Sequence, residues 1–509
     1  MMKRILYFVF WVIFCTSCGN FLEEYSQDLV YAQSCEDLDE ILIGNGYMAQ
    51  PTTPSYFSYG DKAFYYPYLH VMDDDIEEYL TGNANISSSI NPVTTLRNFY
   101  IWAKEPFMRI SGLTFRDYDW KRMYEHIGYL NVIISYVKEF HEDSEEMRHR
   151  ILGEAQFLRA GYYFMLVNLY ANPYSKETAD ATMGVPLNLT EYIEEGYFSR
   201  DPVAAVYRQI VTDLENAIVN LSGIKQPTIY RVNEKAARAL LSRVYLYMQD
   251  WENAKSTAEK LLAQNGALLD YSSIAENTDG YAISEKSPEL LFSQGPLNLQ
   301  CEFSGSGGDF CVSNDLYKLY DENDYRQTIY FTRSTQSDSL GLNRKYQMGK
   351  HRSYVSDIFT LRTAEGYLNA AEACAMLGDA GAASGWLNRL RGKRIKDYED
   401  VVYTAGEIIE QVRVERRKEL CLEGHRWLDL RRYAVCKKSP FKKIIERVYA
   451  LYDWDGRSVF KYAEVYQLNV DDPAYVFAIP KAVLEFDKDM PDNIREDREY
   501  VRLMYRNNE

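Results

Sequence analysis

The sequence predicts a mainly α-helical protein, built from an array of helix pairs with a loop-rich, irregular part beside it. Two observations predict this fold. Apolar residues recur at steps of three and four along several segments, which places them on one face of a helix. Between these segments lie long stretches that are rich in turn-forming residues and show no such period.

The first two helices are predicted at residues 120–137 and 155–169. In the first, the apolar steps alternate between three and four along Trp120, Met123, Ile127, Leu130, Ile134 and Val137. The second repeats the pattern and ends before Asn172–Pro173, because proline does not continue a helix.

Three further helices are predicted at 203–221, 233–248 and 251–266. Pro202 stands where the first of these helices begins, and Asp201 is expected to cap it. Asn233 is expected to cap the second helix in the same way. The tight turn Gln249–Asp250 makes the second and third helices a close pair.

A second helical block is predicted at 361–377, 382–390 and 414–432, and Gly378–Asp379 forms the turn between its first two helices. Such pairs, with small Ala at close crossings, resemble tetratricopeptide repeats, and 243–262 is the nearest match. The period is not a regular one of about 34 residues. Insertions at 171–200 and 264–355 interrupt the array.

The N-terminal residues have the order of a secretory signal. A basic pair is followed by the apolar run Ile5–Phe14 and then by two small residues before Cys18. The run is shorter than the roughly 20 residues that span a bilayer. We expect a signal peptide at 1–17 and a lipid on Cys18, as in bacterial lipoproteins, although Cys15 stands where such sequences usually carry an aliphatic residue. A plain signal peptide is the alternative.

The chain is therefore expected to contain five segments. They are the signal peptide 1–17, a lipid-anchored loop-rich segment 18–118, a helical repeat block 119–263, a loop-rich insertion 264–355, and a second helical block with the C-terminal segment 356–509. Insertions that interrupt a helical scaffold project from it as loops, where binding residues commonly lie.

The composition restricts the partners. A net charge of -17 argues against nucleic acid, because phosphate contacts need clustered Lys and Arg. The same charge opposes binding to anionic lipid heads, so attachment to a membrane should depend on the anchor. Cys301 and Cys311 flank a Gly-rich loop, and whether they pair stays open. No spacing of Cys and His indicates a zinc site, and we predict no cofactor.

Several predicted helices carry carboxylates beside arginines. The carboxylates are Glu154, Glu365, Glu372, Glu415, Glu419, Glu423 and Asp429. A glycosidase needs two carboxylates that flank a cleft, whereas buried ion pairs use the same residue types to join helices. We favour ion pairs and predict neither catalytic residues nor a metal site. The run Asp73–Asp75 lacks EF-hand spacing and indicates a solvated acidic turn rather than a calcium site.

Six segments resemble, in order, the SusD/RagB-like outer-membrane lipoproteins of Bacteroidetes. They are 120–134, 153–174, 231–254, 361–379, 415–432 and 474–493, of which GEAQFLRAGYYF and ERRKELCLEGHRWLDLRR are examples. The resemblance implies a lipid-anchored protein on the outer face of the outer membrane that is not an enzyme. It also implies binding of an oligosaccharide, or in some members a peptide, and its delivery to a SusC-like TonB-dependent transporter that the protein covers as a lid.

Aromatic residues outside the helices are the candidates for ligand contacts. Sugars stack their C–H faces on aromatic rings, and their hydroxyls need polar partners. Because family members often bind ligand just before the first repeat helix and in the mid-chain insertion, we predict contacts from Asn98, Tyr100, Trp102 and Phe310. The alternative is that these rings only pack the irregular part against the helices. Two other functions remain open: a structural or adhesive surface protein without a small ligand, and a secreted glycosidase.

Overall fold

The computed structural model describes most of the chain. The described residues are 32–48, 65–78, 92–108, 117–192, 197–277, 279–294, 310–335, 338–347, 355–454 and 458–505. The predicted signal peptide, Cys18 and Cys301 lie outside these residues. Within the described ranges, no helix is both long enough and apolar enough to cross a membrane.

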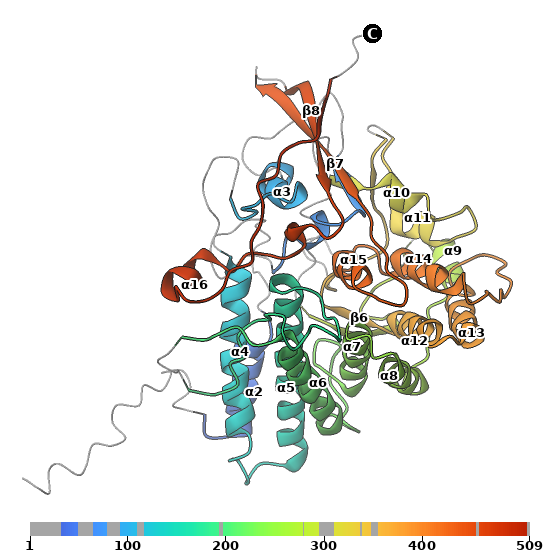
Figure 1. The fold of residues 1–509 in the computed structure, drawn as a ribbon. Helices are drawn as coiled ribbons and strands as arrows, with labels where there is room; N and C mark the ends of the chain where they lie inside the picture. Colours follow the sequence, from blue (N-terminus) through green and yellow to red (C-terminus); the bar gives the residue numbers. More distant parts are fainter. Residues whose placement is uncertain are drawn as a thin grey trace, which may run out of the picture.

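The first helical block is a row of helices in which each packs on the next (Figure 1). Its members are α4 (Tyr118–Tyr136), α5 (Glu145–Tyr170), α6 (Val203–Asn220), α7 (Glu234–Tyr247) and α8 (Trp251–Gln264). The predicted helices are confirmed with one change of boundary. Helix α5 begins well before the predicted residue 155, because its first turns are polar and partly exposed and so carry no apolar stripe.

The second block extends the same row. Its first helices are α12 (Thr363–Leu377), α13 (Ala380–Arg391) and α14 (Ile408–Leu420). Helix α12 packs against α8 and α7 of the first block and against α13 and α14 of its own. The two predicted blocks therefore form one continuous layer, although almost a hundred residues separate α8 from α12 in the sequence.

The single helix predicted over 414–432 is wrong. The chain forms α14 and then α15 (Arg426–Ala434), with a break at residues 421–425. Leu422 has a φ of 57° and Gly424 a φ of 74°, a left-handed conformation that ends α14. A Cβ atom on Gly424 would lie 3.1 Å from Cδ2 of Leu69, so the break also brings this turn against the N-terminal segment.

Helix caps show where local prediction succeeds and where it fails. Asn233 accepts a hydrogen bond from the N–H of Ala236 and caps α7, as predicted. The cap predicted for Asp201 is wrong, because its carboxylate accepts the N–H of Leu187 in the preceding loop. Pro202 is itself the N-cap residue of α6, and no side chain caps that helix.

Short elements make up the rest of the described chain. The helical ones are α2 (Cys35–Ile41), η1 (Leu42–Gly46), η2 (Leu69–Val71), α3 (Pro92–Tyr100), α9 (Tyr271–Glu276), α10 (Asn314–Tyr317), α11 (Arg326–Tyr330), η4 (Pro473–Tyr475) and α16 (Lys481–Phe486). Three antiparallel strand pairs join β1 (Ile76–Glu78) to β3 (Phe310–Val312), β2 (Leu290–Ser293) to β6 (Thr360–Arg362), and β4 (Phe331–Arg333) to β5 (Leu340–Leu342). A three-stranded antiparallel sheet contains β7 (Ile445–Trp454), β8 (Ser458–Leu468) and β9 (Arg502–Met504).

An aromatic cluster joins the N-terminal segment to the C-terminal one. The rings of Tyr68 and Phe99 stack with their centroids 4.5 Å apart, and Phe107 and Phe477 meet them edge-on. Strand β1 also contacts β7. In the view of Figure 1, α3, β7, β8 and α10, which come from distant parts of the chain, lie together above the row of helices.

Candidate functional site

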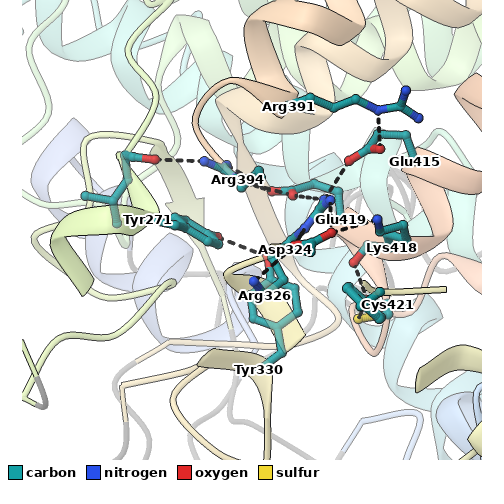
Figure 2. Close-up of polar contacts among 12 residues, drawn as sticks. Tyr271, Asp324, Arg326, Tyr330, Arg391, Arg394, Glu415, Lys418, Glu419 and Cys421 are labelled. Carbon is teal, nitrogen blue, oxygen red and sulfur yellow. Dashed lines mark hydrogen bonds and ion pairs between the residues drawn. The ribbon is translucent and has the colours of Figure 1, made fainter. Parts of the chain in front are cut away.

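A network of buried ion pairs contains two of the carboxylates that a glycosidase could have used, Glu415 and Glu419 (Figure 2). Glu419 of α14 contacts three guanidinium groups: Arg326 at 2.8 Å, Arg362 at 2.6 Å and Arg394 at 3.0 Å. These four side chains are at most 2% exposed. Glu415, one turn earlier, lies 2.7 Å from Arg326. The network thus ties α14 to α11, β6 and the end of α13.

The charges in this network fix the protonation states. Burial favours the protonated carboxyl, but Arg394 and the other guanidiniums hold the pKa of Glu419 well below its ordinary value. Against the same effect of burial, Arg326 and its neighbours lower the pKa of Glu415 to about 2. Carboxylates that stay ionised cannot act as the general acid that glycoside hydrolysis needs.

The remaining carboxylates from the sequence analysis are paired as well. Each lies within a salt-bridge distance of a basic side chain: Glu154 with Arg231, Glu365 with Arg243, Glu372 with Arg432, Glu423 with Arg362, and Asp429 with Arg416. All of these carboxylates are buried. The interpretation of these residues as ion pairs that join helices is confirmed.

The turn Asp73–Asp75 is buried, so the expectation of a solvated turn is wrong. Asp74 accepts hydrogen bonds of 2.6 and 2.9 Å from Arg426 and lies 2.6 Å from Lys443. Burial and the two neighbouring carboxylates raise the pKa of Asp73 well above its ordinary value. In the described part of the chain, these three aspartates are the one group of three or more His, Cys, Asp or Glu side chains whose possible metal-ligand atoms lie within 4.8 Å of one another. Arginine and lysine already neutralise it, so its chemistry fits an ion-pair cluster.

A cavity of about 530 Å³ lies beside this turn. Three stretches far apart in the sequence form its walls, namely residues 74–78, 311–315 and 443–448, together with Tyr100 from α3. The lining combines one aromatic ring and aliphatic side chains with carboxylates, a hydroxyl and two basic groups. Several convergent polar groups in a concave site of this size are typical of a small-ligand site.

Side chains bridge the two strand edges at the wall of the cavity. The hydroxyl of Tyr100 accepts the N–H of Glu78 at 3.0 Å and donates to the carbonyl oxygen of Val448 at 3.2 Å. The carboxylate of Glu78 accepts the N–H of Ala450 at 2.9 Å. Strands β1 and β7 pair with β3 and β8 on their other edges. The bridges therefore hold β1 and β7 together without a backbone ladder between them.

Glu78 makes the stability of this region depend on pH. Burial raises the pKa of its carboxyl to about 8, although the N–H of Ala450 and the charge of Arg97 lower it. At pH values between the ordinary pKa of a glutamate carboxyl and about 8, the folded protein keeps a proton that the unfolded chain has released. The free energy of unfolding therefore falls as pH rises through this range. Replacing Glu78 with Gln removes this loss. Between pH 5 and 8, the wild type should lose about 2–3 kcal/mol more than the Glu78→Gln variant in urea denaturation. Parallel pH profiles for the two proteins would contradict this.

Of the four residues predicted to contact ligand, only Tyr100 lines the cavity, and Asn98 and Tyr100 lie in α3 rather than outside the helices as expected. The ring of Phe310 lies 5.0 Å from that of Tyr100. These two rings and that of Trp102 are at most 2% exposed, and both Trp102 and Asn98 donate hydrogen bonds to backbone carbonyls. The three rings were predicted to stack on a sugar. In the structure each ring packs inside the protein and has no exposed face on which a sugar could stack. A direct ligand contact stays a prediction for these residues.

Most of the polar groups at the cavity were not identified from the sequence. Glu77, Asp315, Lys443, Glu446 and Arg447 line it. The β-branched and aromatic residues of 444–454 could have predicted the strand β7. No local signal indicates that the first residues of this strand meet β1 and α10, because only the tertiary fold brings these segments together.

A second cavity, of about 730 Å³, lies between the loop 223–229 and the N-terminus of α7. Its polar side chains serve the fold, since Asn233 caps α7 and donates to the carbonyl of Leu291, and Glu234 accepts from Arg238. No aromatic ring is among its lining residues. The smaller cavity, which Tyr100 lines, is therefore the better candidate for a ligand site.

Two family models match the chain. Residues 73–246 match a SusD-like model described as starch-binding and associating with the outer membrane, and residues 333–494 match the SusD family model. A curated relative, SusD-like protein P25 of Formosa agariphila, is 25% identical over 269 residues, which are 52% of this chain and 46% of that protein. The match thus spans about half of the relative's length.

Solved structures show the same fold. A SusD-like carbohydrate binding protein from Bacteroides vulgatus is 20% identical, with a TM-score of 0.67 over 92% of this chain and 100% of the other. The surface glycan-binding protein A from Bacteroides uniformis is 18% identical, with a TM-score of 0.64 over 91% of this chain and 99% of the other. At these identities the likeness establishes the architecture of the chain.

Proposed function

The chain belongs to the SusD/RagB-like family, and from this premise we propose that it is a non-catalytic surface lipoprotein that binds an oligosaccharide and delivers it to a SusC-like TonB-dependent transporter. One observation of the structure supports the binding step. The cavity beside β1 and β7 brings many polar groups together from four parts of the chain. Binding of this kind needs hydrogen bonds but no bond cleavage.

The ligand is tested with the soluble form that lacks Cys18. We expect the protein to be retarded by at least one polysaccharide in affinity gel electrophoresis and to release no reducing ends from it. Release of reducing ends would support a glycosidase instead. Failure to bind any member of a broad polysaccharide panel would support an adhesive or structural role and contradict the proposal.

Blocking the cavity should abolish binding. Ile444 lines the cavity and is 49% exposed, so Ile444→Trp adds bulk there without disturbing the core. We expect affinity for the polysaccharide to fall at least about tenfold, because the cavity is filled. Val402 is 79% exposed and is not among the cavity residues, so Val402→Trp is the matched control and should bind like the wild type. Equal affinities of the two variants would place the ligand elsewhere.

The anchor is tested at Cys18. Replacing Cys18 with Ala removes the thiol that carries the lipid, so the protein should move from the membrane fraction to the soluble fraction. Cys15→Leu gives the more usual residue before the lipid site and should stay membrane-bound. Membrane retention of the Cys18→Ala protein would refute the anchor.

The transporter partnership predicts a stable complex. The lipidated protein, extracted in mild detergent, should copurify with a large outer-membrane β-barrel protein. An adhesive protein without a small ligand is not expected to copurify with such a β-barrel protein. Purification of the protein alone, from cells that grow on the bound polysaccharide, would favour that alternative.

A further inference from the structure

The cavity beside β1 and β7 has an unequal balance of charge. Five acidic side chains line it, and only two basic side chains do. The acidic residues are Asp74, Glu77, Glu78, Asp315 and Glu446, of which Glu78 keeps its proton at neutral pH because burial raises its pKa to about 8, and the basic residues are Lys443 and Arg447. The electrostatic character of the site therefore depends on whether the two basic groups are free to meet a ligand.

Both basic groups are committed to the protein. The ammonium of Lys443 lies 2.6 Å from a carboxylate oxygen of Asp74 and 3.7 Å from Asp315. The guanidinium of Arg447 donates to the carbonyl oxygen of Ile76 and lies over the ring of Tyr100, 4.6 Å from its centroid. Arg447 is 3% exposed. Neither group presents a free positive charge to a ligand in the cavity.

The carboxylates, by contrast, keep capacity to accept hydrogen bonds. Glu77 accepts from Asn314 through one oxygen, and Asp315 has a side chain that is 67% exposed. Glu446 forms a half-exposed pair with Arg502 at 3.2 Å, which is weak in water. An ionised carboxylate offers about four acceptor positions, so these three groups can accept from sugar hydroxyls. They would repel a carboxylate or sulfate of the ligand at the same positions.

We propose that this cavity takes uncharged, hydroxyl-rich oligosaccharides and discriminates against chains that carry uronate or sulfate groups, an inference that rests on the proposed function. The net charge of -17 acts in the same direction at longer range. A ligand anion within a few ångströms of one or two partly solvated carboxylates should bind about tenfold more weakly than its neutral counterpart.

The test compares one sugar backbone in two charge states. The soluble protein is first screened against neutral and acidic polysaccharides by affinity gel electrophoresis. A neutral polysaccharide that binds is then carboxymethylated, and both forms are measured by calorimetry. We expect the carboxymethylated form to bind at least about tenfold more weakly in 50 mM salt and to recover part of the difference in 500 mM salt, because salt screens the repulsion.

Matched variants assign the effect to the cavity. Glu77→Gln with Asp315→Asn removes two charges and keeps one acceptor oxygen on each side chain, so it should strengthen binding of the carboxymethylated form severalfold and change binding of the neutral form much less. Glu142→Gln with Glu252→Gln removes two exposed charges that do not line the cavity and should change neither.

The outcomes separate this inference from the function on which it rests. If no polysaccharide of either kind binds, the proposed function fails. If an acidic polysaccharide binds and neutral ones do not, the function stands and the charge preference is overturned. In that case Arg447, whose Nε has no hydrogen-bond partner in the described part of the chain, would be the anion contact. Equal binding of the two charge forms would also overturn it.

Discussion

Replacing Glu419 with Ala should destabilise the protein by about 3–5 kcal/mol, because the change leaves three buried guanidinium groups without their shared counter-ion. Arg326, Arg362 and Arg394 all contact this carboxylate, and none of them is more than 2% exposed. Figure 2 shows Arg326 and Arg394 beside Glu419. In the variant, Asp324 still pairs with Arg326, and Glu289 still pairs with Arg394. These remaining ion pairs limit the loss of stability.

Urea denaturation followed by circular dichroism measures this loss. Glu446→Ala is the control, because Glu446 is also paired with an arginine but both side chains are about half-exposed. An exposed pair contributes about 0–1 kcal/mol, so the unfolding midpoint of the control should stay close to that of the wild type. If Glu419→Ala and Glu446→Ala had the same small effect, the network around Glu419 would not hold α14 to its neighbours.

Replacing Trp102 with Ala should also cost about 3–5 kcal/mol, the usual range for removing a large buried aromatic side chain. Trp102 is 1% exposed, and its indole N–H donates to the carbonyl oxygen of Met72 at 2.9 Å. The change opens a void beside the guanidinium of Arg447, which lies 5.6 Å from the centroid of the Trp102 ring, and it leaves the carbonyl of Met72 without this donor. Thermal and urea unfolding of the soluble form give the measurement.

Trp102→Phe separates packing from ligand binding. Phenylalanine keeps most of the buried ring and loses the indole hydrogen bond, so we expect about 1–2 kcal/mol of destabilisation. Affinity for the polysaccharide should not change, because the ring is buried. A variant that folds with this small loss and no longer binds would instead support the ligand contact predicted from the sequence for Trp102.

The helices were the most predictable part of the fold. Steps of three and four in apolar residues located α4, α6, α7, α8 and α12, because a helix that buries one face must repeat at its own period. Asn233 could be assigned as a cap, since its side chain acts on a backbone group three residues away. Asp201 had the same local signal, yet its carboxylate binds Leu187, a choice that depends on where the preceding loop returns to the helix.

The candidate site was less predictable. Tyr100 and Phe310 were selected because aromatic rings outside helices suit sugars. The structure places Tyr100 at the end of α3, where it lines the cavity, and packs the ring of Phe310 against it. Lys443 and Arg447 gave no signal, because a basic residue in a strand or just before it has no local feature that shows which carboxylate or ring it will meet.

The helical segments, the resemblance to the family and the pairing of carboxylates with arginines could all be predicted from the sequence alone. Each of these depends on residue type and spacing along a short stretch of chain. Only the tertiary structure decided that α12 continues the row begun by α4, that Asp73–Asp75 is buried, and that residues 74–78, 311–315 and 443–448 enclose one cavity. These features join residues that are hundreds of positions apart, and the energy of such contacts depends on packing in three dimensions, which no local pattern specifies.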